Sequence, residues 1–398
     1  MKVLFVGGLF SSKQIDFINS TSSGVVQNAA DVLQKNIIKS LKLHAKEVEV
    51  VNLPFIGSYP ALSSCLYFPP VIDDFGKAKI TGLGFLNLPF IKHFSRFISL
   101  TKYLFSIEES RSLQLLVYSY HLPFMISAYL FKRFSSGVNI FIVVPDLPEY
   151  MSDNNSFVYR FLKRVEVFFG DALLKKFDGY IFLTNQMAVR YGVDRDDYIV
   201  VEGVADISDF SLSVGFTDSV RYIFYSGTLA ERYGIRELVD SYISLDIDDI
   251  QLFICGEGDS RGYIESCAKQ NSKIKFFGQL SREKVIELQK NALLLVNPRR
   301  ADSEFTKYSF PSKVIEYMSS GRPVLMNVLP GIPEEYYDYC FSPSGHTVSD
   351  FTNCLRDTLK LDPRQLDSMG ANAKKFIEEK KSYSSQGLRI YQFLMRKI

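Results

Sequence analysis

The sequence predicts an α/β protein built from two doubly wound units, in which helices cover both faces of parallel sheets. Its 398 residues are too many for one ordinary domain and suit two domains of similar size. Short apolar runs rich in Val, Ile and Phe recur along the chain, separated by longer helix-like stretches. Because these runs are continuously hydrophobic, they indicate strands that are buried on both faces.

About six runs in each half are expected to form strands. In the first half they are Val3–Val6, Val48–Val51, Leu113–Tyr118, Val138–Val144, Tyr180–Leu183 and Tyr198–Val201. In the second half they are Tyr222–Tyr225, Gln251–Cys255, Ile274–Phe277, Ala292–Val296, Pro323–Met326 and, as the weakest candidate, Tyr339–Phe341.

The polar stretch Ile207–Ser219 marks the boundary between the two units, because it has little periodicity and contains glycine and serine turns. We expect an N-terminal domain over residues 1–212 and a C-terminal domain over residues 213–381. A final helix over residues 382–398 is expected to pack back on the first domain.

Composition limits the class of protein without identifying it. Hydrophobic residues are 46% and charged residues 23%, which suits a globular protein, and the formal net charge of +2 points to no particular partner. Five dispersed cysteines without a CxxC pair favour reduced thiols and a cytoplasmic protein. We recognise no signal peptide, no membrane-spanning run, and no basic stripe of the kind that binds nucleic acid.

The most informative stretch runs from Asn297 to Val324 and follows a predicted strand. Within it, Pro311 and Gly321 stand where the start and the end of a short helix favour them. A helix N-terminus attracts anions, and Lys313 in the first turn adds a full positive charge. Glu316, one turn later on the same face, could accept two hydrogen bonds from a ribose diol. The alternative is a solvated Lys–Glu pair on an ordinary helix.

Two arginines, Arg299 and Arg300, stand at the end of the preceding strand, where open α/β sheets bind ligands. The whole stretch resembles the donor-binding segment of the family-4 glycosyltransferases. Members of this family have the GT-B fold, in which two Rossmann-like domains face each other across a cleft. The stretch is most similar to a bacterial subgroup that reads FPSK-x-x-EYM-x-SG-x-PV, found among capsule, exopolysaccharide, O-antigen and galactofuranosyl transferases.

The resemblance implies that the C-terminal domain binds a nucleotide sugar and that Glu316 holds the nucleotide ribose. The family often has a second glutamate eight residues earlier, which contacts the transferred sugar. That position is Tyr308 in this sequence, so Asp302 and Glu304 are possible substitutes.

The loop after the first strand of the second half, Tyr225-Ser226-Gly227-Thr228-Leu229, resembles the family's diphosphate loop. The family's arginine and lysine are replaced there by Thr228 and Tyr233, and Arg232 is the nearby cation. We therefore expect Arg232, Arg299 and Lys313 to share the diphosphate charge. Gly256 and Gly258 match the loop beneath the base, and Phe277-Gly278 a further base-contacting loop, although glycines after strands are often plain turns.

Three candidate residues of the N-terminal domain stand at the ends of predicted strands. Gly8 lies in Gly7-Gly8-Leu9-Phe10-Ser11-Ser12, which lacks the spacing of a dinucleotide fingerprint and resembles the glycine loop that this family places over the cleft. His121 and Asp146 could position the acceptor hydroxyl or the sugar, although structural roles remain open for both.

Two stretches combine basic and aromatic residues. Phe90–Phe105 contains Lys92, Arg96 and Lys102 without an acid, and Phe157–Lys176 carries aromatic and basic residues at helical spacing. Such a pattern is typical of a helix that lies on an anionic membrane surface. The alternative is an amphipathic helix that faces the protein core.

Together these features predict a retaining glycosyltransferase that moves a sugar from a nucleotide sugar, expected to be UDP-linked, to a lipid-linked or surface-glycan hydroxyl. It would act in the cytoplasm or at the inner face of the cell membrane, with no cofactor beyond its donor substrate and no metal. One alternative is a sugar-nucleotide epimerase of the same fold. Another is a non-catalytic partner that binds nucleotide sugar, for which Tyr308 is the main support.

Overall fold

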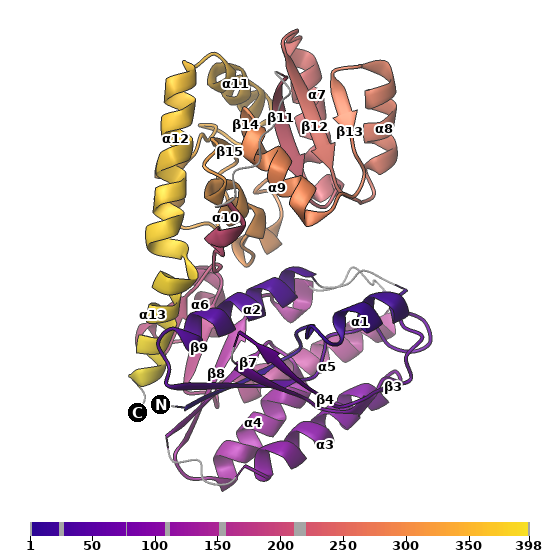
Figure 1. Ribbon diagram of the computed structural model, residues 1–398, viewed down its shortest axis with the longest axis vertical. Helices are drawn as coiled ribbons and strands as arrows, with labels where there is room; N and C mark the ends of the chain where they lie inside the picture. The colour runs from indigo at the N-terminus through magenta and orange to yellow at the C-terminus, as the bar shows by residue number, and fades with distance from the viewer. Residues whose placement is uncertain are drawn as a thin grey trace. The chain divides into compact units, whose positions relative to one another are not determined.

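The computed structural model describes residues 2–23, 28–76, 78–107, 112–150, 157–210 and 220–396. The chain divides into two compact units; in Figure 1 the ribbon is coloured by residue number. Unit 1 comprises Met1–Val204 together with Tyr383–Ile398, and unit 2 comprises Ala205–Ser382. The boundary expected between residues 212 and 213 falls outside the described residues.

Unit 1 is built on an eight-stranded sheet of order β10-β9-β8-β7-β1-β2-β5-β4. Its strands are β1 Lys2–Gly7, β2 Glu47–Asn52, β4 Val71–Phe75, β5 Ala78–Gly82, β7 Leu113–Tyr118, β8 Val138–Val144, β9 Gly179–Phe182 and β10 Tyr198–Val200. All neighbours are parallel except β4, which pairs antiparallel with β5. The six strands expected in the first half are confirmed. A separate two-stranded sheet pairs β3 Tyr67–Phe68 with β6 Phe85–Leu86.

The hairpin of β4 and β5 was not predicted. Its residues 71–82 intersperse Asp and Lys with apolar residues, so they lack the continuous apolar run that identifies a central parallel strand. A charged edge strand of this kind ends the sheet and discourages further pairing.

Helices cover both faces of the unit 1 sheet. They are α1 Ile15–Thr21, α2 Asn28–Lys42, α3 Ile91–Phe105, α4 Leu122–Phe134, α5 Phe157–Leu174, α6 Asn185–Tyr191 and α13 Tyr383–Met395. Figure 1 shows α2 beside α13, and α4 contacts both α3 and α5. Val3 and Phe5 pack in one core with residues of α2 and α13, and the alternate residues of β1 point to the opposite face.

The last helix, α13, completes the core of unit 1. Its Ile390, Phe393 and Leu394 are at most 1% exposed and pack with the central strands. Gly387 lies so close to α2 that an added Cβ would be 2.6 Å from the Ser40 carbonyl oxygen. A helix far away in the sequence is therefore an integral layer of the N-terminal sheet.

Unit 2 is a five-stranded parallel sheet of order β13-β12-β11-β14-β15. Its strands are β11 Arg221–Ser226, β12 Ile250–Cys255, β13 Ile274–Phe276, β14 Leu294–Asn297 and β15 Val324–Met326. Its helices are α7 Ile235–Leu245, α8 Arg261–Gln270, α9 Arg282–Asn291, α10 Ser312–Ser319, α11 Val348–Leu359 and α12 Pro363–Phe376. Five of the six expected strands are confirmed.

The sixth, Tyr339–Phe341, is wrong as a strand. Residues Glu334–Tyr339 form a 3-10 helix, and only Phe341 reaches the sheet, through one parallel bridge to Leu325. Among the described residues, no helix has the length and apolar character needed to cross a bilayer.

Replacing Phe393 of α13 with Ala should lower the free energy of unfolding of unit 1 by about 3–5 kcal/mol, because a fully packed ring is lost from the core. Urea unfolding followed by circular dichroism measures this change. Leu388→Ala on the same helix is the matched control, since Leu388 is 42% exposed and its loss should change stability by about 0.5 kcal/mol or less. Equal effects of both variants would contradict the placement of α13.

Candidate functional site

Two glycine loops pack backbone against backbone at the carboxyl edge of the unit 2 sheet. Gly256 has a φ of +140°, and an added Cβ would lie 1.8 Å from the Gly227 carbonyl oxygen. An added Cβ at Gly258 would lie 2.5 Å from the backbone of Leu229, whose N–H donates to the Glu257 carbonyl at 2.9 Å. Gly256 and Gly258 therefore permit the loops after β11 and β12 to interlock.

The phenol of Tyr317 attaches α10 to the end of β11. It accepts a hydrogen bond from the Ser226 N–H at 2.8 Å and donates to the Ser226 carbonyl at 3.0 Å. Tyr317 is 1% exposed, and burial raises its pKa well above the usual value, so the phenol stays protonated. This pair of bonds places Glu316, the preceding residue, beside the glycine loop that follows Ser226.

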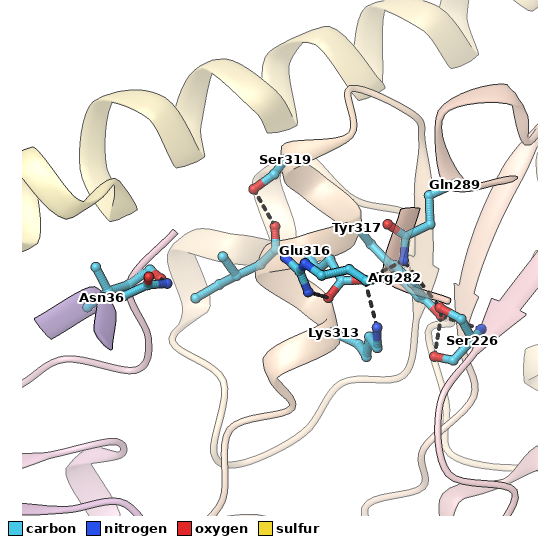
Figure 2. Close-up of polar contacts among 10 residues, drawn as sticks. Asn36, Ser226, Arg282, Gln289, Lys313, Glu316, Tyr317 and Ser319 are labelled. Atoms are coloured by element: carbon cyan, nitrogen blue, oxygen red, sulfur yellow. Dashed lines mark hydrogen bonds and ion pairs between the residues drawn. The ribbon is translucent and has the colours of Figure 1, made fainter. Parts of the chain in front are cut away.

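Glu316 is the centre of a polar network, shown in Figure 2. Its Oε1 accepts from Lys313 Nζ at 2.6 Å and from Gln289 Nε2 at 2.5 Å, while Arg282 Nη1 lies 3.9 Å from Oε2. Burial by itself would raise the pKa of Glu316, but the Lys313 charge and these hydrogen bonds outweigh it and lower the pKa. The carboxylate is therefore ionised at neutral pH, and it is not the solvated pair of an ordinary helix, because its side chain is only 17% exposed.

Two cations from separate loops share one pair of aromatic rings. Arg299 lies with its guanidinium carbon 4.9 Å from the ring centre of Tyr233 and 4.5 Å from that of Phe305. The corresponding distances for Arg232 are 5.2 and 5.8 Å. Arg299 also donates to Ser309 Oγ at 2.8 Å. The structure thus places Arg232 and Arg299 against the same two aromatic rings.

The remaining candidates of unit 2 have different surroundings. Arg300 forms ion pairs at 3.1 Å with Glu237 and with Asp302. Glu304 is exposed, and Tyr308 closes the 3-10 turn Glu304–Lys307.

Exposed Thr228, on the glycine loop, accepts a hydrogen bond at its carbonyl from the Tyr225 phenol at 2.8 Å. Burial raises the pKa of the Cys255 thiol at the end of β12 to about 12, while the charge of Lys313 opposes this rise.

In unit 1, Gly8, His121 and Asp146 follow the neighbouring strands β1, β7 and β8, so they lie at one edge of that sheet. Gly8 donates its N–H to Gln34 Oε1 at 2.8 Å, and an added Cβ would lie 2.5 Å from the Phe55 ring. The N–H of Phe10 donates to Asp31 Oδ1 at 2.7 Å. Two backbone donors of this glycine loop, those of Gly8 and Phe10, are thus already bound to side chains of α2.

His121 is the N-cap residue of α4 and lies within an aromatic cluster, with its ring centre 4.4 Å from that of Phe124, 5.5 Å from that of His93 and 5.7 Å from that of Phe55. Neither ring nitrogen has a hydrogen-bond partner in the described part of the chain. Burial, reinforced by the nearby Arg96 charge, lowers the pKa of His121 well below its usual value, so the imidazole is neutral. Asp146 is exposed, and its charge adds to burial in raising the pKa of Tyr118.

Lys92 and Arg96 of the basic stretch Phe90–Phe105 are buried. They are therefore not the exposed cations expected of a helix that lies on an anionic membrane surface. Arg96 is 2% exposed, donates to the Pro54 carbonyl and lies 4.5 Å from the Phe85 ring centre. Lys92 is buried and donates to the Ile56 carbonyl at 2.8 Å, and burial lowers its pKa to about 8. Both side chains satisfy carbonyl groups of the loop after β2, a role that composition does not reveal.

Residues that the sequence did not single out complete the network around Glu316. Arg282 and Gln289 both lie on α9, seven residues and thus two helical turns apart, so they occupy one face. That spacing was visible in the sequence, but nothing in it indicated that the face would meet α10. In the described part of the chain, no cluster of His, Cys, Asp and Glu could hold a metal ion, and the five cysteines are free thiols.

Comparison with known proteins gives a match for residues 209–376 to the family described as glycosyl transferases group 1. A search of curated proteins found no match. Similar solved structures include the apo lipopolysaccharide outer core galactosyltransferase WaaB, at 13% identity and a TM-score of 0.65 over 100% of both chains.

Two further solved structures match over 100% of this chain and 100% of their own length. HepE from Anabaena in complex with UDP has 14% identity and a TM-score of 0.67, and the trehalose-6-phosphate synthase OtsA has 11% identity and a TM-score of 0.71. At these identities the likeness establishes the fold, which is GT-B.

The unfolding free energy should fall as the pH is lowered from about 7 to about 5. Below the usual pKa of 6.5 the unfolded chain binds a proton at His121, while the folded chain, whose pKa is lowered, does not. The stabilisation is complete above that pH and is lost as the pH falls toward the folded pKa. His121→Phe should flatten this slope in urea titrations, whereas Phe393→Ala should lower stability without changing the slope. An unchanged slope in His121→Phe would mean that the imidazole is not held neutral.

Proposed function

We propose that this chain, which matches the group 1 glycosyl transferases over residues 209–376 and has the GT-B fold, is a retaining glycosyltransferase that uses a UDP-linked sugar. Its acceptor would be a hydroxyl of a lipid-linked or surface-glycan molecule. The observation that carries the proposal is the ionised carboxylate of Glu316, held at the carboxyl edge of the unit 2 sheet. Ligands of open α/β sheets bind at this edge.

Glu316 is suited to bind the ribose of the donor. Oε1 is occupied by Lys313 and Gln289, whereas Oε2 has only Arg282 at 3.9 Å among the contacts of the described side chains, too long for a hydrogen bond. A charged acceptor of this kind forms stronger hydrogen bonds to hydroxyl groups than a neutral acceptor does. UDP is the nucleotide that we infer, because HepE, which shares the fold, was determined with UDP.

The diphosphate would be held by positive charge at the same edge. The first turn of α10 contains Lys313, and no side chain caps its N-terminus, so backbone N–H groups remain available to an anion. Arg232 and Arg299 form the second positive group, against Tyr233 and Phe305. Together these cations would stabilise the departing diphosphate while the acceptor attacks the same face of the sugar, so no protein nucleophile is needed.

For contact with the sugar and the acceptor we propose Tyr308, His121 and Asp146. Tyr308 occupies the position of the family's sugar-binding glutamate and would offer a phenol in its place. The neutral imidazole of His121 can both donate and accept a hydrogen bond, and exposed Asp146 could accept the proton of an acceptor hydroxyl.

A lipid-linked acceptor fits the exposed face of α5. Arg164, Val165, Phe168 and Phe169 are all exposed and recur at helical spacing, with Phe168 71% and Phe169 60% exposed. Exposed aromatic side chains interleaved with arginine suit insertion at an anionic lipid surface. We propose that the enzyme binds the inner face of the membrane through this helix and not through Lys92 and Arg96.

A panel of nucleotide sugars, with release of free nucleotide as the readout, should yield UDP from at least one UDP-sugar. Glu316→Ala should weaken UDP binding by about 1.5–3 kcal/mol in calorimetry, because a charged hydrogen-bond acceptor is lost. Glu265→Ala is the control, since this carboxylate forms a 2.7 Å ion pair with Arg261 on α8, away from the network. Unchanged UDP affinity in Glu316→Ala would refute the ribose contact.

Arg299→Ala and Lys313→Ala should each weaken UDP binding by about 1.5–3 kcal/mol and leave uridine binding nearly unchanged, because both cations would contact phosphate. Lys284→Ala, which removes an exposed lysine paired with Glu287 on α9, should affect neither ligand. Equal losses for UDP and uridine would show that Arg299 and Lys313 do not touch phosphate.

The protein should float with anionic liposomes at low salt and dissociate as salt rises, since each basic residue near the surface contributes about 1 kcal/mol. A double variant, Phe168→Ser with Phe169→Ser, should lose flotation. Phe134→Ser is the control, because Phe134 is 72% exposed but lies on α4. Flotation that persists in the double variant would exclude α5 as the contact.

A further inference from the structure

We propose that Gln289 is a positioning residue, whose amide fixes the carboxylate of Glu316 in the orientation that binds ribose. This inference rests on the proposed function, because it takes Glu316 as the ribose ligand. Gln289 lies in the last turn of α9, is 0% exposed, and therefore cannot itself contact the donor in this structure. It would act through Glu316 alone.

The amide bridges two elements that it does not belong to, as Figure 2 shows. Its Nε2 donates to Glu316 Oε1 on α10 at 2.5 Å and to Ser226 Oγ at the end of β11 at 3.2 Å. Ser226 Oγ lies in turn 3.3 Å from the Tyr317 phenol. One side chain thus links the strand, the helix and the carboxylate through hydrogen bonds of a single NH2 group.

The orientation of this amide is determined by its neighbours. Ionised Glu316 can only accept hydrogen bonds, so the NH2 end of Gln289 must face it. The other end, Oε1, is buried and has no hydrogen-bond partner in the described part of the chain. A buried acceptor without a partner is unfavourable for stability. The side chain is therefore better explained by its effect on Glu316 than by its contribution to folding.

The consequence is a division of roles between the two oxygens of Glu316. Oε1 receives Gln289 and Lys313, which together prevent rotation of the carboxylate. Oε2 remains available for a ribose hydroxyl. Leucine at position 289 could not donate, and glutamate would place a second negative charge beside Glu316.

The test compares Gln289→Leu and Gln289→Glu with the wild type by calorimetry with uridine and with UDP. Gln289→Leu should weaken both ligands by the same factor, about tenfold, because the effect reaches only the ribose. Gln270→Leu on α8 is the control and should bind as the wild type. An effect on UDP without an effect on uridine would overturn the proposal.

Gln289→Glu adds a pH signature that a purely structural role would not produce. At about pH 8 the two carboxylates repel each other, so uridine should bind weakly. As the pH falls, one of the pair takes up a proton, because its pKa is raised by the other charge, and the protonated carboxyl group introduced at position 289 can again donate to Glu316. Affinity should therefore recover toward about pH 5.5 in Gln289→Glu but not in Gln289→Leu. Because this recovery is measured on one protein, misfolding cannot imitate it, and its absence would overturn the proposal.

A double-variant cycle separates this inference from the proposed function. In a Glu316→Ala background, Gln289→Leu should cause no further loss of uridine affinity. If Glu316→Ala itself binds uridine as the wild type does, the ribose contact fails, and with it the proposed function. If Glu316→Ala is impaired while both Gln289 variants bind normally, only the positioning role fails.

Discussion

Two hydrogen bonds between the buried phenol of Tyr317 and the backbone of Ser226 fix α10 against the central strand of unit 2. This attachment determines where Glu316 lies in the candidate site. It sets Glu316 within reach of Gln289, whose amide also donates to Ser226 Oγ at the end of β11. The site is thus built on regular elements whose relative position is fixed by buried backbone contacts, which suits a ligand that must be held rigidly.

The sequence predicted the central strands of both sheets well, but it predicted the strands at the sheet edges poorly. Continuous apolar runs identified the central parallel strands of both sheets, because such strands are buried on both faces and carry little else. The hairpin of Val71–Phe75 and Ala78–Gly82 was missed because its residues intersperse charged with apolar side chains. Tyr339–Phe341 was overestimated because a run of aromatic residues has the composition of a strand whether or not it pairs.

The site residues show the same limit. Glu316, Lys313 and Arg299 could be selected because they stand at a strand end or in a helix whose boundaries the sequence marks. Gln289 could not, since its contact with Glu316, 27 residues later in the chain, depends on how the helices α9 and α10 approach each other. Arg96 is the opposite case: its charge suggested a surface, yet it lies buried against a backbone carbonyl and an aromatic ring. Local sequence indicates the charge of a side chain, but only tertiary packing decides which way it points.

The path of the chain through α13 also has a consequence for how the protein is made. Unit 2 is a single continuous segment, so all of its strands have been synthesised before α13 emerges from the ribosome. Unit 1 takes Ile390, Phe393 and Leu394 into its core, so the face of its central sheet that α2 and α13 share stays only partly covered until then. The usual order of synthesis, in which the N-terminal domain folds first, is therefore expected to be reversed here. The nascent sheet of unit 1 would remain the part most exposed to chaperones, and the second unit would be the first to reach its native state.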